Sequence, residues 1–289
     1  MLSKAPLRRL LIRPGALGDC IVSLPALEAL RAAYTEVWTT APHVPLIRFA
    51  DRVRALSSTG LDLLELGQAT PALLRELASF DSIVSWYGSS RREFRDAVAG
   101  LPFHFFPALP KDSAVHATEF YALQAESLGG HVASRAPRLP VPRTASMPYA
   151  VIHPYSGSVK KNWPLDRYLE LAAQLDLPAA FTAGPEEPLP SGIPIRRFDN
   201  LWELATWLGN ATYYIGNDSG PTHLAAAAGT PTVAIFGPSE ARVWAPHAAH
   251  VVASSSPGEW PNVADVLAAL VELRRCNVEN SSSAPPAPG

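Results

Sequence analysis

The 289-residue sequence has no long hydrophobic run. It contains no stretch of about 18 uninterrupted apolar residues, so we expect no helix that spans a membrane. The N-terminal stretch carries positive charge, but Arg13, Pro14 and Asp19 interrupt its apolar residues. We therefore expect no signal peptide.

Cysteine is scarce. Cys20 and Cys276 are the only two, and they do not form a C-x-x-C pair. This excludes a disulfide scaffold and a zinc site of the cysteine type, and it favours a reducing compartment. The sequence also lacks D-x-D, H-E-x-x-H and any cluster of histidine and cysteine, so we expect no metal. A G-x-S-x-G elbow is absent, because 216–220 has the wrong spacing.

Net charge is close to zero, at −2 from 24 basic and 26 acidic residues. This balance argues against nucleic acid as the main partner. The length allows two ordinary domains, and a hydrophobic content of 47% is enough for a substantial core.

The most informative stretch is 214–238, which reads Y-I-G-N-D-S-G-P-T-H-L-A-A-A-A-G-T-P-T-V-A-I-F-G-P. The pattern predicts a strand end, a polar turn, a small-residue helix over 222–228 and a buried strand over 232–236. Pro221 suits a first helical turn and Gly229 a helix end.

Two interpretations of this stretch stay open. The start of the helix offers backbone amides, a positive dipole end and the side chains of Ser219, Thr222 and His223, which together suit a phosphate group. The same residues also suit an ordinary, well-capped crossover between two strands.

The N-terminal half opens in a similar way. Residues 7–12 predict a buried strand, 13–19 a glycine-containing loop and 21–34 a helix. Asp19 stands at the junction of loop and helix. It is either a first-turn acid favoured by the helix dipole or a carboxylate available as a general base.

Further elements follow in this half. We expect short strands at 37–40, 54–56, 82–86 and 104–106, and helices near 42–49, 71–78, 91–99 and 116–128. Arg91, Arg92 and Arg95 follow the strand at 82–86. They are either a grip for an acidic acceptor or a solvated helix face.

The second half begins after a proline-rich linker at 136–149. Strands are expected at 150–153, 179–183, 195–198, 212–215 and around 251, and helices at 164–175, 201–208 and 263–274. Lys160 and Lys161 lie in the loop that follows the first of these strands. They are either surface residues or a ligand for a phosphate group. Glu186 and Glu187 follow the second, where an acid can bind ribose hydroxyls.

These patterns predict an α/β fold with two βα-rich halves. We expect an N-terminal domain at 1–140, a C-terminal domain at 149–275 and a low-complexity, disordered tail at 276–289.

Four blocks resemble one known family. They are L-L-I-R-P-G-A-L-G-D-C-I-V-S-L-P-A-L at 10–27, V-I-H-P-Y-S-G-S-V-K-K-N-W-P at 151–164, A-G-P-E-E at 183–187, and 216–238. The sequence thereby resembles glycosyltransferase family 9, the ADP-heptose:lipopolysaccharide heptosyltransferases. The second and fourth blocks are the most specific, and the four span both halves.

The resemblance implies a GT-B fold, in which two Rossmann-like, doubly wound domains face each other across a cleft. It implies an N-terminal domain on the acceptor side and a C-terminal domain that binds the nucleotide sugar. The implied reaction is an inverting transfer from a nucleotide sugar, typically ADP-linked, without a metal or other cofactor. Asp19 matches the catalytic base, Lys161 the diphosphate-binding lysine, and Ser219, Gly220, Thr222 and His223 the donor loop. Glu187, or its neighbour Glu186, and Asp218 match contacts to the donor's ribose or base. Gly18, Arg91, Arg92 and Arg95 are acceptor-side candidates.

The implied partners are a nucleotide-sugar donor and a lipid-linked glycan acceptor. We expect a cytoplasmic protein with peripheral contact to the inner membrane through Arg8/Arg9 and Arg91/Arg92/Arg95. A different donor sugar or nucleotide, and a non-catalytic nucleotide-sugar- or glycan-binding relative, are the alternatives. Retention of both Asp19 and Lys161 argues against the non-catalytic one.

Overall fold

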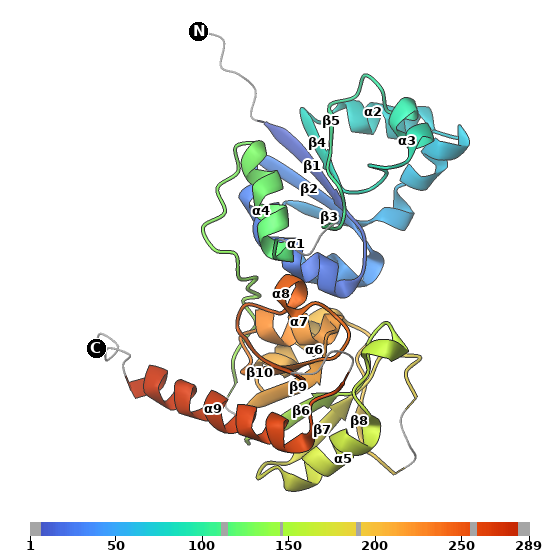
Figure 1. Cartoon of the computed structure of the whole chain (residues 1–289). Helices are drawn as coiled ribbons and strands as arrows, with labels where there is room; N and C mark the ends of the chain where they lie inside the picture. Colours follow the sequence, from blue (N-terminus) through green and yellow to red (C-terminus); the bar gives the residue numbers. More distant parts are fainter. Residues whose placement is uncertain (1–6, 111–114, 145–146, 189–191, 255–258, 283–289) are drawn as a thin grey trace. The chain divides into compact units, whose positions relative to one another are not determined.

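A computed structural model of the chain describes residues 7–110, 115–144, 147–188, 192–254 and 259–282 (Figure 1). The chain forms two compact units. The N-terminal unit comprises 1–139 with 200–203, and the C-terminal unit comprises 140–199 with 204–289. The sequence patterns did not predict that 200–203 belong to the N-terminal unit.

The N-terminal unit is built on a five-stranded parallel sheet in the order β3-β2-β1-β4-β5. Its central strand is buried on both faces, since Leu10, Leu11 and Ile12 have no exposed surface. A strand of this kind is typical of a sheet covered by helices on each side. The strands are β1 (Arg8–Arg13), β2 (Tyr34–Thr39), β3 (Arg52–Ala55), β4 (Ser82–Ser85) and β5 (Phe103–Phe105).

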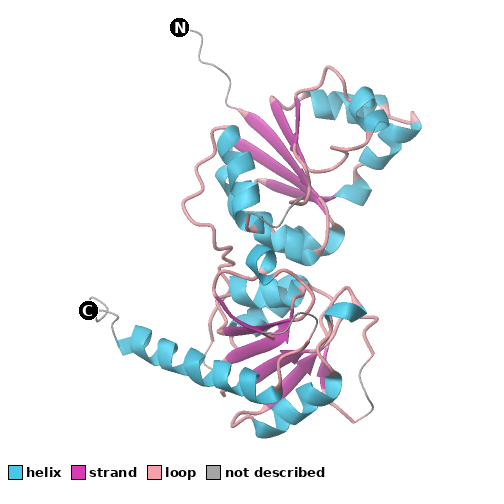
Figure 2. Cartoon of the chain, in the orientation of Figure 1, coloured by secondary structure: helices cyan, strands magenta, loops and turns pink. Residues whose placement is uncertain are grey.

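Helices cover both faces of this sheet (Figures 1 and 2). α1 (Leu17–Ala29) and α4 (Ala117–Ser127) pack side by side. α2 (Pro71–Ala78) and α3 (Arg92–Ala97) supply Leu73, Leu77 and Phe94 to a core that also contains Leu10 and Ile12. Three short 3-10 helices complete the unit: η1 (Ala41–Leu46), η2 (Leu56–Ser58) and η3 (Leu61–Leu66).

The C-terminal unit contains a six-stranded parallel sheet in the order β11-β10-β9-β6-β7-β8. Numbered from its first strand, this is the 3-2-1-4-5-6 order of a Rossmann fold. The strands are β6 (Ala150–His153), β7 (Ala179–Thr182), β8 (Ile195–Arg196), β9 (Tyr213–Asn217), β10 (Thr232–Phe236) and β11 (Ala249–Ala253).

Its core lies between the sheet and two helices that pack together, α5 (Leu165–Gln174) and α9 (Val263–Ser282). Tyr168, Leu171 and Val266 from these helices contact the same cluster as Ile152 and Ile215 from the strands. The remaining helices are η4 (Val159–Lys161), α6 (Leu201–Gly209), α7 (Gly220–Ala227) and α8 (Ala241–Trp244). The two Rossmann-like, doubly wound sheets confirm the predicted fold class.

Several predicted boundaries were wrong. α1 begins at Leu17 rather than Ile21, because the left-handed turn at Gly15 (φ 141°) ends the loop early. It stops at Ala29, since Tyr34 already pairs with Arg8 in the sheet. α9 continues to Ser282, so residues 276–282 of the predicted disordered tail are helical. Nothing there breaks a helix, because the first proline beyond 263 is Pro285. Residues 283–289 lie outside the described residues.

Candidate functional site

Parallel α/β sheets bind ligands outside the carboxyl ends of the strands, at the point where the strand order reverses, which is called the switch point. This position lies between β1 and β4 in the N-terminal unit and between β6 and β9 in the C-terminal unit. Asp19 lies just after β1, and the three candidate arginines follow β4. Lys161 and Asp218 follow β6 and β9. Each sheet thus brings predicted residues to its own switch point.

Asp19 is the third residue of α1 and is half-buried. Its Oδ2 accepts a hydrogen bond of 3.3 Å from the amide of Ala16, the residue before the helix. This is one half of a capping box, because alanine has no side-chain oxygen to return the bond. The other carboxylate oxygen makes no hydrogen bond to any residue that the structure describes. A carboxylate held on one side in this way suits a proton acceptor.

Arg13, at the end of β1, lies beneath the loop that leads to Asp19. The residue is only 2% exposed. Its guanidinium donates to the carbonyls of Pro14 and Asp19 and to the hydroxyl of Tyr121, which stands on α4. Sequence analysis gave Arg13 no role, because an arginine before a proline-glycine turn reads as a surface residue.

His43 of η1 is a second buried polar group next to this loop. The neighbouring Thr40 hydroxyl bonds with both the amide and the carbonyl of Gly15, at 3.2 Å each. Burial, together with the positive charge of Arg13, lowers the pKa of the His43 imidazole to about 4. The ring is therefore neutral in the folded protein near pH 7.

This pKa predicts a pH-dependent stability. The folded ring titrates near 4 and the unfolded ring near 6.5, so the unfolded state takes up the proton first as pH falls. We expect the free energy of unfolding to drop by up to about 3 kcal/mol between about pH 6.5 and about pH 4. Thermal melts across this range should show a shallower pH slope in His43→Gln, whereas His104→Gln, at an exposed site, should retain the wild-type slope. Parallel slopes in wild type and His43→Gln would contradict the assignment.

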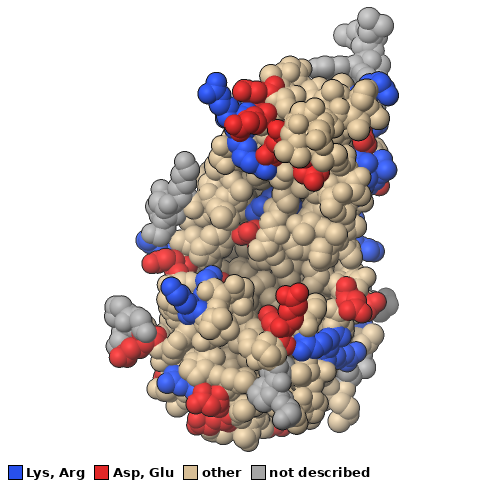
Figure 3. Space-filling view, turned by 90° about the vertical axis from the view of Figure 1, so that its right-hand side faces the viewer, with Lys and Arg blue, Asp and Glu red and all other residues tan. Residues whose placement is uncertain are grey.

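The acceptor-side candidates are largely engaged within the N-terminal unit. Arg91 pairs with Glu65 at 2.5 Å and stacks on the ring of Tyr87. Arg92 pairs with Asp96 at 3.6 Å, and Arg95 lies over Phe105. On the face drawn in Figure 3, basic and acidic side chains alternate rather than gather into a patch of one sign. Gly18 lies in the first turn of α1, beside Asp19.

In the C-terminal unit, Lys161 and Asp218 form an ion pair across the switch point. Lys161 Nζ lies 2.7 Å from Asp218 Oδ2. The lysine is 39% exposed at its side chain and the aspartate 7%, so the ammonium borders solvent while the carboxylate is buried behind it. The neighbouring Lys160 is exposed. The loop pattern alone did not distinguish the two lysines, and the structure pairs Asp218 with Lys161, the lysine that the family resemblance selects.

α7 begins immediately after this pair, at Gly220 with Pro221 in its first turn. Its first amides have no helical partners, and its positive dipole end lies at the same place. The Thr222 hydroxyl is fully buried and donates to the Asn217 carbonyl at 2.5 Å, so this side chain braces the turn. Ser219 Oγ bonds with Thr222 Oγ1 at 3.1 Å, and His223 is 5% exposed.

Glu187 lies on a different loop, after β7, with β6 between it and Asp218 in the sheet. Its Oε2 accepts from the Gly184 amide at 2.6 Å and stands 3.6 Å from Nε2 of His153. His153 Nδ1 carries a proton, because it bonds the Thr182 carbonyl at 3.0 Å. Burial lowers the pKa of this histidine, although the Glu187 charge acts in the opposite direction. Glu186 is exposed.

Asn217 is a residue whose importance the sequence patterns did not reveal. Its Oδ1 accepts from the Trp163 amide at 2.8 Å and the Tyr168 hydroxyl at 2.9 Å, and its Nδ2 donates to the Pro154 carbonyl at 2.8 Å. The side chain therefore fastens both ends of the loop that carries Lys161 to the end of β9. Its place in the motif G-N-D-S-G was visible, but its partners are 49 to 63 residues away.

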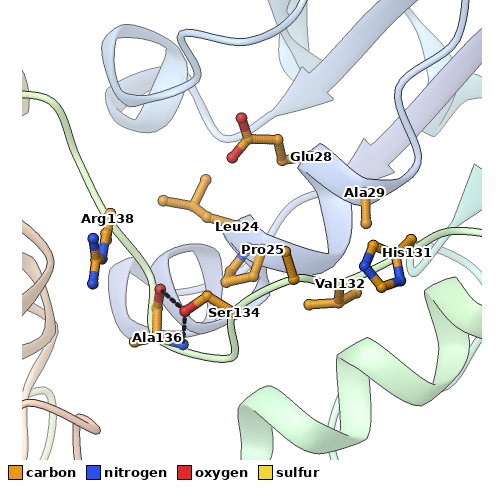
Figure 4. A pocket seen from close by; sticks show the side chains of 10 residues that line it. Leu24, Pro25, Glu28, Ala29, His131, Val132, Ser134, Ala136 and Arg138 are labelled. Atoms are coloured by element: carbon orange, nitrogen blue, oxygen red, sulfur yellow. Dashed lines mark hydrogen bonds between the residues drawn. The ribbon is translucent and has the colours of Figure 1, made fainter.

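A cavity of about 350 Å³ lies elsewhere in the N-terminal unit, between the second half of α1 and 131–138 (Figure 4). Leu24, Pro25 and Val132 form its apolar part, and Glu28 and Arg138 stand at its rim. None of the predicted site residues lines it. Among the residues that the structure describes, no group of three or more His, Cys, Asp and Glu could hold a metal ion. Within the same residues, no helix is both long and apolar enough to cross a membrane.

Comparisons with known proteins agree with this fold. Residues 199–266 match the family model of glycosyltransferase family 9 (heptosyltransferase). A curated relative, lipopolysaccharide heptosyltransferase 3 of Escherichia coli (strain K12), is 26% identical over 36% of this chain. The match spans only 35% of that relative's length.

Solved structures extend the likeness to both units. A family 9 glycosyl transferase from Veillonella parvula has a TM-score of 0.72 at 18% identity, covering 92% of this chain and 97% of its own. The E. coli heptosyltransferase WaaC with ADP has a TM-score of 0.66 at 18% identity, covering 92% and 100%. By fold, the chain is a GT-B-type α/β protein. By sequence, residues 199–266 match the model of glycosyltransferase family 9, as the resemblance of the block at 216–238 predicts.

Proposed function

We propose that the chain is an inverting glycosyltransferase that moves heptose from ADP-heptose to a lipopolysaccharide-core acceptor without a metal. The observation that carries this proposal is the Lys161–Asp218 pair beside the first turn of α7, at the switch point of the C-terminal sheet. A half-exposed ammonium next to unpaired helix amides suits a diphosphate. The relatives supply the donor class, since one is named a lipopolysaccharide heptosyltransferase and another binds ADP.

The proposed reaction assigns one role to each unit. Asp19 takes the proton from an acceptor hydroxyl as its oxygen bonds to the anomeric carbon of the sugar, contributing about 10²–10⁴-fold. The bond from that carbon to the diphosphate breaks in the same step, on the opposite face, which inverts the centre. Lys161 and the amides at 219–220 stabilise the charge that develops on the leaving ADP. Glu187 is the proposed contact to the donor's ribose.

The acceptor is proposed to be a lipid-linked glycan reached from the cytoplasmic side. Gly18 precedes Asp19 in α1, and Arg91 follows β4, the strand next to β1. We propose that the acceptor approaches Asp19 over these residues. We assign Arg91 and Arg92 no contact with the membrane, because each already has an acidic partner.

A thermal-shift panel of ADP, UDP, GDP, CDP and NAD, in the presence of a chelator, tests the donor assignment. We expect ADP to raise the melting temperature by about 5–10 °C at a hundredfold excess over its Kd, and the others by much less. A shift with UDP or GDP alone would change the nucleotide but preserve the class of reaction. A shift with NAD alone would contradict a glycosyltransferase function. ADP binding without transfer from ADP-heptose to lipopolysaccharide acceptors would indicate a non-catalytic relative.

A further inference from the structure

The Arg13 guanidinium is a buried charge with no ion pair to any residue that the structure describes. It is 2% exposed, and no carboxylate of a residue that the structure describes lies within 4.0 Å of it. Its Nε is buried without a hydrogen-bond partner in the same residues. A buried charge without a carboxylate in direct contact normally costs stability.

Neutral groups hold this guanidinium on three sides. Nη1 donates to the Pro14 carbonyl at 2.6 Å, and Nη2 donates to the Asp19 carbonyl at 3.2 Å and the Tyr121 hydroxyl at 2.8 Å. Tyr121 is itself fully buried, and its hydroxyl donates onward to the Ala108 carbonyl at 2.6 Å. The contacts join β1, the first turn of α1, α4 and the segment after β5.

Helix electrostatics make this arrangement unfavourable for stability alone. The guanidinium contacts residues on either side of the start of α1, where the helix dipole is positive and acids are preferred. An apolar side chain at this position would avoid both the desolvation and the dipole penalty. What Arg13 adds is a rigid, three-point fork that fixes the backbone at Asp19 itself.

Arg13 and the Asp19 carboxylate both lie so close to Gly15 that a larger residue there would crowd them. A Cβ at Gly15 would lie 3.0 Å from Arg13 Nη1 and 3.3 Å from Asp19 Oδ2, so the two atoms are at most about 6.3 Å apart. Gly15 also has a φ of 141°, which other residues rarely adopt. The fixed positive charge and the carboxylate therefore both lie against Gly15, within about 6.3 Å of each other.

We propose that Arg13 and Tyr121 are a positioning unit for Asp19. The fork holds the first turn of α1 so that the carboxylate keeps one orientation, and Tyr121 locks the fork to α4. This inference rests on the proposed function of Asp19 as the base, since it names the residues on which that base depends.

Arg13→Ala tests the proposal by the separation of kcat from KM. We expect kcat to fall about 10- to 100-fold, the loss typical of a base misplaced by about 1 Å, with the KM for the donor unchanged. Added guanidinium ion should restore part of kcat by filling the vacated space, whereas urea should not. Arg54→Ala is the matched control, because Arg54 is also a largely buried arginine of this sheet but bonds Glu36 and Glu76 rather than the loop before α1. Its kcat should be unchanged.

Tyr121→Phe supports the test if Arg13→Ala fails to fold. It removes the hydroxyl that links Arg13 to Ala108 but preserves the ring beneath the guanidinium. A smaller loss of kcat, again at constant donor KM, is expected. Wild-type kcat in Tyr121→Phe and in any folded Arg13→Ala would overturn the proposal.

A thiol provides a readout that does not depend on activity. Cys20 follows Asp19, is 2% exposed, and has a pKa raised to about 12 by burial. In a Cys276→Ser background, we expect Arg13→Ala to speed maleimide labelling of Cys20 about tenfold, and guanidinium ion to slow it again. Faster labelling in an enzyme that transfers no sugar would sink the proposed function but not the positioning of Asp19. Unchanged labelling with normal transfer would sink the positioning role alone.

Discussion

Asp19→Asn is expected to lower kcat by about 10²–10⁴-fold while ADP affinity stays at the wild-type value. The amide oxygen of asparagine can accept the Ala16 bond that Oδ2 accepts now, so the first turn of α1 should keep its geometry. What asparagine cannot do is take up the acceptor's proton. The measurement is steady-state transfer from ADP-heptose, together with calorimetric titration of ADP.

Glu28→Gln is the matched control for this variant. It removes the other acid of α1, at the exposed far end of the same helix, and should leave kcat unchanged. Wild-type turnover in Asp19→Asn would contradict the assignment of Asp19 as the general base. A loss of ADP affinity equal to the loss of kcat would instead assign Asp19 to donor binding.

Lys161→Ala is expected to weaken ADP binding by about 10- to 100-fold, which corresponds to the loss of a hydrogen bond between charged groups. The variant also leaves the Asp218 carboxylate, 7% exposed, without its partner and facing an anionic ligand. Lys160→Ala is the control, because it removes an exposed positive charge from the adjacent residue and should have little effect. ADP affinity is measured by titration calorimetry at constant ionic strength.

The double variant Lys161→Ala/Asp218→Asn separates these two contributions. Removing the carboxylate should recover part of the affinity lost in the single variant, with a coupling energy of about 0.5–3 kcal/mol. Strict additivity of the two single changes would show that the ion pair does not act on the ligand. Equal ADP affinity in wild type and Lys161→Ala would remove the lysine from the proposed donor site.

Strands and helices with strong local signals could be predicted from the sequence. β6 and β10 have the predicted bounds, and α2 coincides with the predicted 71–78, because a hydrophobic run or an amphipathic repeat lies between clear turn residues. The ends of α1 and α9 could not be predicted from local signals. The ends of α1 depend on the turn at Gly15 and on the pairing of β2 with β1, and the end of α9 depends on continuation of the helix into a polar tail. The four-residue α8 is too short to show a period.

The sequence also selected the site residues by type but did not assign their partners. It grouped Asp218 with Glu187 as ribose or base contacts, whereas the structure pairs Asp218 with Lys161 and turns Glu187 toward Gly184 and His153. It placed Thr222 among phosphate ligands, although its hydroxyl is occupied by Asn217. Lys161 and Asp218 are 57 residues apart, and His153 and Glu187 lie at the ends of neighbouring strands, so no local pattern could reveal these two pairings.

By itself, the sequence determined the α/β class, the two Rossmann-like halves, the family resemblance and the positions of Asp19 and Lys161 at strand ends. All of these follow from local periodicity and from short motifs. Only the tertiary structure decided that Arg13 and His43 are buried next to the loop before Asp19, that Asn217 fastens the Lys161 loop, and that Lys161 rather than Lys160 contacts Asp218. The physical reason is distance along the chain. Burial and hydrogen bonding are set by residues tens of positions away, which come together only when each sheet forms.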